Sequence, residues 1–202
     1  MNGRRGPRTI LPHAVSPRLA EPVARAVART GITPNAITLL GFIVNLLAAW
    51  LAADGRWLAA GLVMLVGSGL DLLDGALARA TGRTSRFGAI FDAILDRYSE
   101  AAVLFGLVVF YEARGDLLQV WLAFVALAGS VMVSLMRARA ETLGMSLREG
   151  LFTRAERVVL TALALIAGAW WPIAVTGALW LLAVLTSLTA LQRLYLIWKP
   201  KG

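Results

Sequence analysis

Six long apolar stretches, separated by short polar segments, make up most of this chain. A helix needs roughly 20 mainly apolar residues to cross the hydrocarbon core of a bilayer. Stretches that meet this requirement cover residues 34–53, 57–80, 86–112, 117–140, 155–171 and 173–198. The pattern therefore predicts an all-α, polytopic membrane protein with six transmembrane helices in a single domain, residues 34–202.

The first 33 residues follow a different pattern, because arginines interrupt every apolar run. Over residues 17–30, apolar side chains such as Val23 and Val27 recur between the arginines. This arrangement predicts an amphipathic helix that lies on an anionic membrane surface; the alternative is a basic tail without defined structure. Pro34 then suits the first turn of a helix, where a missing backbone N–H is tolerated. We therefore expect residues 1–33 to form a cytoplasmic tail and a juxtamembrane amphipathic helix.

Composition and charge support a membrane location and orient the chain. Hydrophobic residues make up 58% of the 202 positions, more than the surface of a soluble domain tolerates. Of the 20 lysines and arginines, only Arg56 and Arg114 lie in the loops after the first and third predicted spans. Because basic loops stay on the cytoplasmic side, we expect a multi-pass protein of the cytoplasmic (inner) membrane with both termini in the cytoplasm. The net charge of +8 then reflects topology, and no nucleic-acid partner is expected.

A block of strictly spaced polar residues interrupts the second and third apolar stretches. It reads Asp71-x2-Asp74-Gly75-x2-Ala78-Arg79-x8-Gly88-x3-Asp92-x3-Asp96. On a helix, the first two aspartates lie about 60° apart and the last two about 40° apart. If residues 81–86 form a tight reversal, the two pairs face each other near the cytoplasmic membrane boundary.

Four carboxylates in so small a space need a counter-charge, and a divalent cation is the simplest one. No cysteine is present and the lone histidine lies far away in the N-terminal tail, so hard ions such as Mg2+ or Mn2+ are favoured over Zn2+. Ions held in this way suit a phosphate or pyrophosphate substrate. Gly75 and Gly88 could instead serve close helix packing, and Arg79 could either anchor the membrane interface or bind phosphate.

The spaced block resembles the hallmark of the CDP-alcohol phosphotransferases (CDP-alcohol phosphatidyltransferases), with every fixed position of the family pattern present. The resemblance implies a membrane enzyme that transfers a phosphatidyl-type group from a CDP-linked lipid to the hydroxyl of a second alcohol and releases CMP. It also implies that residues 34–202 form the catalytic domain and that the protein is a homodimer.

By the same resemblance, Asp71, Asp74 and Asp92 hold two metal ions, Mg2+ or Mn2+. Asp96 either ligates metal or acts as the general base. The positions implied to bind the CDP-lipid are Asn35, Thr38, Gly75, Ala78, Arg79, Ser85 and Gly88.

A second polar cluster lies toward the cytoplasmic ends of the last three predicted spans. Arg137 and Arg193 fall within or at the ends of apolar stretches, where a charge is costly and usually has a partner or a role. Residues 134–141 and 153–157 resemble the corresponding stretches of prokaryotic phosphatidylinositol phosphate synthases, a branch of the same family. That resemblance implies inositol 1-phosphate as the acceptor. The basic residues implied to bind its phosphate are Arg137, Arg154 or Arg157, and Arg193. At the first of these the relatives carry lysine, which keeps the charge but lacks the guanidinium fork.

Two alternatives stay open on the sequence. One is the same transfer to glycerol 3-phosphate or another polar alcohol. The other is a membrane cation transporter, because intramembrane carboxylates also mark ion pathways; the position of the aspartates near the cytoplasmic ends of two consecutive spans argues against it. The donor is expected to be CDP-diacylglycerol or a related CDP-lipid, since an apolar groove discriminates poorly between hydrocarbon tails.

Overall fold

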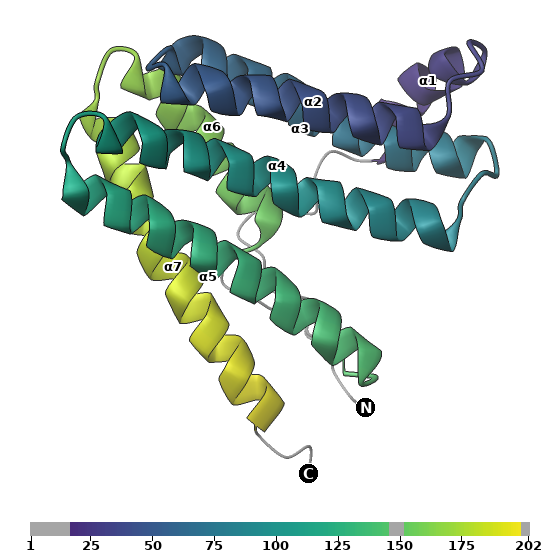
Figure 1. The fold of residues 1–202 in the computed structure, drawn as a ribbon. Helices are drawn as coiled ribbons and strands as arrows, with labels where there is room; N and C mark the ends of the chain where they lie inside the picture. Colours follow the sequence, from purple (N-terminus) through teal and green to yellow (C-terminus); the bar gives the residue numbers. More distant parts are fainter. Residues whose placement is uncertain (1–16, 146–151, 199–202) are drawn as a thin grey trace.

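The computed structural model describes residues 17–145 and 152–198, and within these residues all regular structure is helical. The predicted N-terminal tail before residue 17 lies outside the described residues. The described residues form seven α-helices, whose arrangement can be followed in Figure 1. They are α1 (Pro17–Ala28), α2 (Pro34–Ala53), α3 (Trp57–Ala80), α4 (Arg86–Glu112), α5 (Leu117–Thr142), α6 (Arg154–Gly168) and α7 (Ile173–Trp198).

Residues 17–28 form a helix, α1, and its amphipathic placement on a membrane surface stays a prediction. Of the six helices predicted within residues 34–198, four, α2, α3, α4 and α7, begin and end at the predicted residues. The other two differ by one to three residues: α5 ends two residues later than predicted, and α6 begins one residue earlier and ends three residues earlier. The largest difference is at the end of α6, which stops at Gly168 instead of residue 171. A Cβ at Gly168 would lie 2.9 Å from the Trp57 ring and 2.5 Å from Val175, so α6 ends where it meets α3 and α7.

Local signals explain where the helices around the aspartates begin and end. Thr33 caps α2, since its hydroxyl accepts the N–H of Ala36 at 3.3 Å. The predicted reversal over residues 81–86 is also confirmed. Gly82 adopts a φ of 65°, a left-handed conformation that favours glycine, and the Ser85 hydroxyl accepts the N–H of Gly88 at 2.9 Å to start α4.

Among the described residues, four helices are long and apolar enough to cross a membrane: α2, α3, α5 and α7. Helix α4 has the length, with 27 residues, but charged residues interrupt its apolar surface. Helix α6 has only 15 residues and therefore a length of about 22 Å, less than the roughly 30 Å of a hydrocarbon core. The count of six spans stays a prediction.

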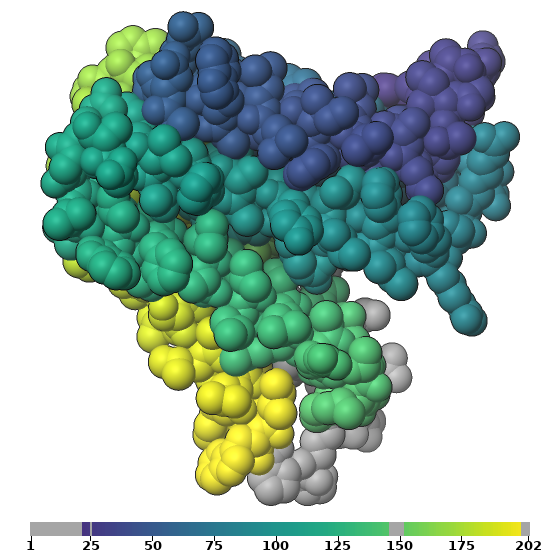
Figure 2. Space-filling model, in the orientation of Figure 1, coloured from purple at the N-terminus to yellow at the C-terminus, as the bar shows by residue number. Residues whose placement is uncertain are grey.

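Helix α2 packs against both α3 and α4, and α3 also packs against α1 and α6 (Figure 1). Helix α5 packs on α4 and α7, and the C-terminal parts of α5 and α7 project away from α2, α3 and α4 in Figure 2. The main apolar core includes Trp57, Leu107, Phe110, Leu122 and Leu179. These residues come from the helix halves remote from the aspartates, so the aspartate half of the protein is left for polar side chains.

Candidate active site

The two aspartate pairs lie on neighbouring antiparallel helices, as the spacing predicts. Asp71 and Asp74 are in the C-terminal half of α3, and Asp92 and Asp96 are in the N-terminal half of α4. Asp74 is only 4% exposed, and the Asp71 side chain is 8% exposed. Asp92 interacts electrostatically with both α3 aspartates, and Asp96 interacts with Asp71. The reversal between the helices therefore concentrates negative charge in a partly buried space.

A basic side chain enters this acidic cluster from α6. The guanidinium of Arg154 lies 2.9 Å from Asp71 Oδ2 and 2.7 Å from Asp96 Oδ2, and so bridges the two helices. Within the described residues, no three acidic side chains converge closely enough to form a ready metal site. The predicted convergence of all four carboxylates is therefore only partial, because Arg154 already supplies part of the counter-charge between two of them.

The donor set nevertheless fits a hard divalent cation. Asp92 Oδ1 and Asp96 Oδ1 are buried and have no hydrogen-bond partner, an arrangement that is costly for a carboxylate unless something neutralises it. Asp74 Oδ2 accepts a hydrogen bond of 2.5 Å from the Thr38 hydroxyl, which orients this carboxylate. All available donors are oxygens, the ligands that Mg2+ and Mn2+ prefer.

Three of the residues predicted to contact the nucleotide come together at the start of α4. A Cβ at Gly88 would lie 3.0 Å from Ser85 Oγ and 3.1 Å from Asn35 Oδ1. Asn35 lies in the first turn of α2, so residues from two helices meet at a glycine whose missing side chain allows their close approach. Thr38, also on α2, is directed toward Asp74 instead.

The other three predicted nucleotide contacts lie near the C-terminal end of α3. Arg79 is exposed, and its Nη1 lies 3.3 Å from the position that a Cβ at Gly75 would occupy. Ala78 is half-buried in the same turn. This exposed guanidinium close to the acidic cluster can meet an anionic ligand that enters from the helix ends.

Two of the predicted phosphate-binding arginines lie on α5 and α7. Arg137 is exposed and forms an ion pair of 2.9 Å with Glu141, one turn further along α5. Arg193 is 3% exposed and donates a hydrogen bond from Nη1 to the carbonyl of Val133, while its Nε is buried without a partner. Arg193 is also within electrostatic range of Arg137.

Arg157 has a different environment from the other arginines. It is 1% exposed, and its guanidinium donates two hydrogen bonds to Glu100 on α4, at 2.5 and 2.9 Å. A third hydrogen bond, of 3.4 Å, goes to the carbonyl of Phe152. Because these partners occupy the guanidinium, the placement argues against the predicted phosphate contact of Arg157.

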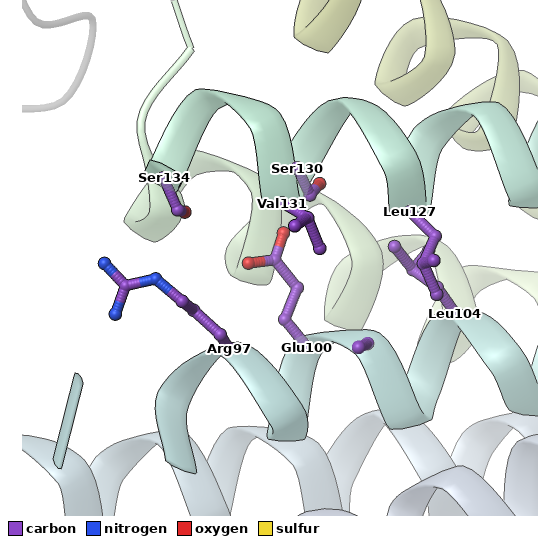
Figure 3. Close-up of a pocket in the computed structure, with 8 residues that line it drawn as sticks. Arg97, Glu100, Leu104, Leu127, Ser130, Val131 and Ser134 are labelled. Atoms are coloured by element: carbon purple, nitrogen blue, oxygen red, sulfur yellow. The ribbon is translucent and has the colours of Figure 1, made fainter. Parts of the chain in front are cut away.

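The structure adds residues to the site that the sequence analysis missed. Glu100 follows Asp96 by four residues and continues the same face of α4, and this spacing was a usable signal. Gly41 on α2 gave no such signal, although a Cβ there would lie 2.7 Å from Asp71 Oδ1. Figure 3 shows a small pocket between α4 and α5 beside this site, with Arg97 and Glu100 on one wall and Ser134 on the other.

Comparison with known proteins identifies the class of this site. Residues 31–190 match the CDP-alcohol phosphatidyltransferase family, and the chain belongs to this family. It is therefore a membrane-embedded transferase of phospholipid biosynthesis. The archaetidylinositol phosphate synthase of Pyrococcus horikoshii is 39% identical over 185 residues, which cover 90% of this chain and 93% of that protein.

Solved structures of one bacterial enzyme share the fold. The phosphatidylinositol phosphate synthase of Mycobacterium tuberculosis with CDP-DAG bound is 34% identical, with a TM-score of 0.84 over 92% of this chain and 96% of that one. The same enzyme in complex with manganese and citrate also gives a TM-score of 0.84, over 91% of this chain and 90% of that one. The chain is thus similar to synthases of inositol phosphate lipids along nearly its whole length.

Proposed function

We propose that this protein transfers a phosphatidyl-type group from a CDP-linked lipid to inositol 1-phosphate and releases CMP. The observation that carries the proposal is the two-sided site. Carboxylates on α3 and α4 form one side, Arg154 on α6 reaches them, and Arg137 and Arg193 lie on the neighbouring helices. A site that places cations beside an acidic centre suits an acceptor that carries its own phosphate.

The comparisons support the same acceptor and donor. The relatives that match over nearly the whole chain are named as synthases of archaetidylinositol phosphate and phosphatidylinositol phosphate. One of them binds CDP-DAG. The donor proposed here is therefore CDP-diacylglycerol or a related CDP-lipid, ether-linked or ester-linked. Family membership removes the cation transporter as an alternative, whereas glycerol 3-phosphate or another polar alcohol stays the alternative acceptor.

The residues that would hold the metal are Asp71, Asp74, Asp92 and Asp96. The proposed cofactor is two ions of Mg2+ or Mn2+, in line with the manganese complex of the mycobacterial relative. When bound, such ions would neutralise the pyrophosphate of the donor and the charge that develops on the departing CMP.

The chain's own residues then orient and activate the reactants. Asp96 is the proposed general base, because Oδ1 is buried without a hydrogen-bond partner and can take the proton of an inositol hydroxyl. The deprotonated oxygen attacks the lipid-side phosphorus, and the bond from that phosphorus to CMP breaks in line. Arg154 and Arg193 bind the acceptor's phosphate in this scheme.

Residues at the ends of α2, α3 and α4 form the proposed nucleotide site. The absence of a side chain at Gly88 lets Asn35 and Ser85 lie close together at the helix ends, where their oxygens can contact a ligand. Arg79 supplies a positive charge near the CDP phosphates. Gly75 and Ala78 are small, so they leave space beside Arg79 for the ligand. Thr38 is better explained by its hydrogen bond to Asp74, which makes it a positioning residue.

The proposed membrane placement puts this site at the cytoplasmic face. The charge distribution favours cytoplasmic termini in an inner membrane and six spans in residues 34–202. Helix α1 packs on α3, where Ala24 is 1% exposed, while Val23 is 47% exposed. An exposed apolar residue on a helix at this end is suited to a membrane interface. The expected homodimer stays a prediction.

Transfer to a panel of acceptors tests the proposed function. Purified protein with CDP-diacylglycerol and Mg2+ should release CMP with inositol 1-phosphate, and should release much less with free inositol, serine or glycerol 3-phosphate. EDTA should stop the reaction reversibly. Mg2+ or Mn2+ should restore the activity. Ca2+ should restore little, because the coordination shell of Ca2+ is larger and looser and fits a small carboxylate site poorly. Equal CMP release with free inositol would refute the acceptor, and full activity in EDTA would refute the metal.

Replacing Thr38 by valine should weaken metal binding and slow CMP release by about 10- to 100-fold, the usual cost of losing a partner that orients a metal ligand. Valine keeps the shape of threonine but cannot donate to Asp74. Titration with Mn2+ measures the affinity, and an assay of CMP release measures the rate. Ser187→Ala is the control, since the Ser187 hydroxyl donates within α7 to the carbonyl of Ala183. Unchanged Mn2+ affinity in Thr38→Val would contradict the positioning role.

A further inference from the structure

Two ion pairs connect α6 to α4, and only one of them involves the aspartate block. Arg154 pairs with Asp96, and Arg157 pairs with Glu100. The arginines are three residues apart and the acidic residues are four apart, so each set occupies one face of its helix. Both helices run in the same direction away from the aspartate end. The Arg157–Glu100 pair therefore lies about one helical turn further from the aspartates than the Arg154–Asp96 pair.

The Glu100–Arg157 pair is buried and well formed. Glu100 is 7% exposed and Arg157 is 1% exposed, and their two hydrogen bonds are of the bidentate kind that fixes direction as well as distance. The third hydrogen bond, to the carbonyl of Phe152, holds the segment that leads into α6. The first turn of α6 is further closed by the N–H of Thr153, which donates to Glu156 at 2.5 Å.

The stability of the folded protein does not by itself explain a buried ion pair of this kind. Removing two charges from water costs about as much as their attraction returns, and apolar residues of similar volume often serve a buried position equally well. What the pair does supply is a defined rotation. Within the described residues α6 packs mainly against α3 and α7, and the two ion pairs are directional links from α6 to α4.

We infer that the Glu100–Arg157 pair is a positioning pair: it sets the rotation of α6 so that Arg154 reaches Asp71 and Asp96 and can receive the acceptor's phosphate. This inference rests on the proposed function. Arg157 does not touch the acceptor; it acts through Arg154, which precedes it by three residues. The charged residues of the segment 153–157 thus divide three tasks: Glu156 caps the helix, Arg157 orients it, and Arg154 reaches the site.

The test uses the variant E100M/R157M, which removes both charges and keeps similar side-chain volumes. A single change such as Glu100→Gln leaves an unpaired charge in the interior and can fail to fold, whereas the double variant avoids this. The melting temperature should stay close to that of the wild type. The KM for inositol 1-phosphate should rise about tenfold or more, within the range of up to about 100-fold expected for a misplaced positioning group. The KM for the CDP-lipid should change little.

A double-mutant cycle shows whether the pair acts through Arg154. In the Arg154→Ala background, E100M/R157M should raise the acceptor KM little further, because the side chain that it positions is absent. Leu165→Ala is the control for general destabilisation. Leu165 is fully buried on the same helix, so its loss should lower the melting temperature and leave the acceptor KM unchanged.

Each outcome decides the inference. A specific rise in acceptor KM that disappears in the Arg154→Ala background supports it. A folded E100M/R157M protein with a wild-type acceptor KM overturns it, and so does a rise of equal size with and without Arg154. Failure of the wild-type protein to transfer to inositol 1-phosphate overturns the proposed function together with the inference, so the two failures are distinguishable.

Discussion

Replacing Asp92 by asparagine should reduce CMP release to less than about one hundredth of the wild-type rate. Even residues that only orient a metal ligand cost about 10- to 100-fold when they are lost, and Asp92 is a proposed ligand. Asparagine matches aspartate in shape and still offers an oxygen, but it removes one negative charge from the site. Asp92 Oδ1 is buried without a hydrogen-bond partner, so no hydrogen bond at this atom would compensate for a lost cation.

The same loss is expected for Asp71→Asn and Asp74→Asn, with the folded protein retained in the membrane in each case. Asp54→Asn is the matched control. Asp54 pairs with Arg56 at 2.7 Å, and both side chains are largely exposed. Such a pair contributes at most about 1 kcal/mol, and it lies at the opposite ends of α2 and α3 from the aspartate block. Near-normal CMP release by the Asp92→Asn protein would refute a metal centre built on these carboxylates.

Arg154→Ala should raise the KM for inositol 1-phosphate by about 10- to 150-fold. That range corresponds to the roughly 1.5 to 3 kcal/mol of a hydrogen bond to a charged group. Arg154 is the proposed phosphate ligand nearest to the reacting centre, because its guanidinium contacts both Asp71 and Asp96. The KM for the CDP-lipid should change much less. Initial rates measured with each substrate varied in turn separate the two constants.

Two further variants sharpen this test. Arg154→Lys keeps the charge but loses the planar fork that can hold two groups at once, so its acceptor KM should lie between those of the wild type and the alanine variant. Arg139→Ala is the control. Arg139 is exposed near the C-terminal end of α5, close to Arg137 in sequence, and has no proposed contact with the acceptor. If Arg154→Ala changed only the donor's KM, the assignment of the acceptor pocket would be wrong, although family membership and the aspartate centre would stand.

Reassigning Arg157 changes how the phosphate pocket is understood. Both arginines of the segment 153–157 were candidates, and both lie on the same face of α6. The buried partner of Arg157 leaves Arg154 and Arg193 as the proposed contacts, with Arg137 exposed nearby. One basic residue is thus used for structure, which explains why the segment carries more charge than a single phosphate requires.

Much of the fold follows from local features that the chain itself carries. Apolar runs of sufficient length, ended by Gly55 and Gly82 or started by Pro34, place helix boundaries within a few residues because the determinants of a helix are its own side chains and caps. The aspartate block is local in the same sense. Its spacing places each pair on one helix face, and the short reversal between the helices brings the pairs together.

The choice among the arginines depends on contacts between distant segments. Arg154 meets a carboxylate 83 residues away, and Arg157 meets one 57 residues away. Two arginines three residues apart on one helix look equivalent in sequence, and the carboxylate that each one meets depends on how α6 lies against α3 and α4. Close packing contributes to that arrangement: a Cβ at Gly61 would lie 2.7 Å from the carbonyl of Ala162, so α3 and α6 lie in direct contact there. Helix positions and the metal-binding pattern are therefore readable along the chain, whereas the partner of each charge is decided by how the helices pack.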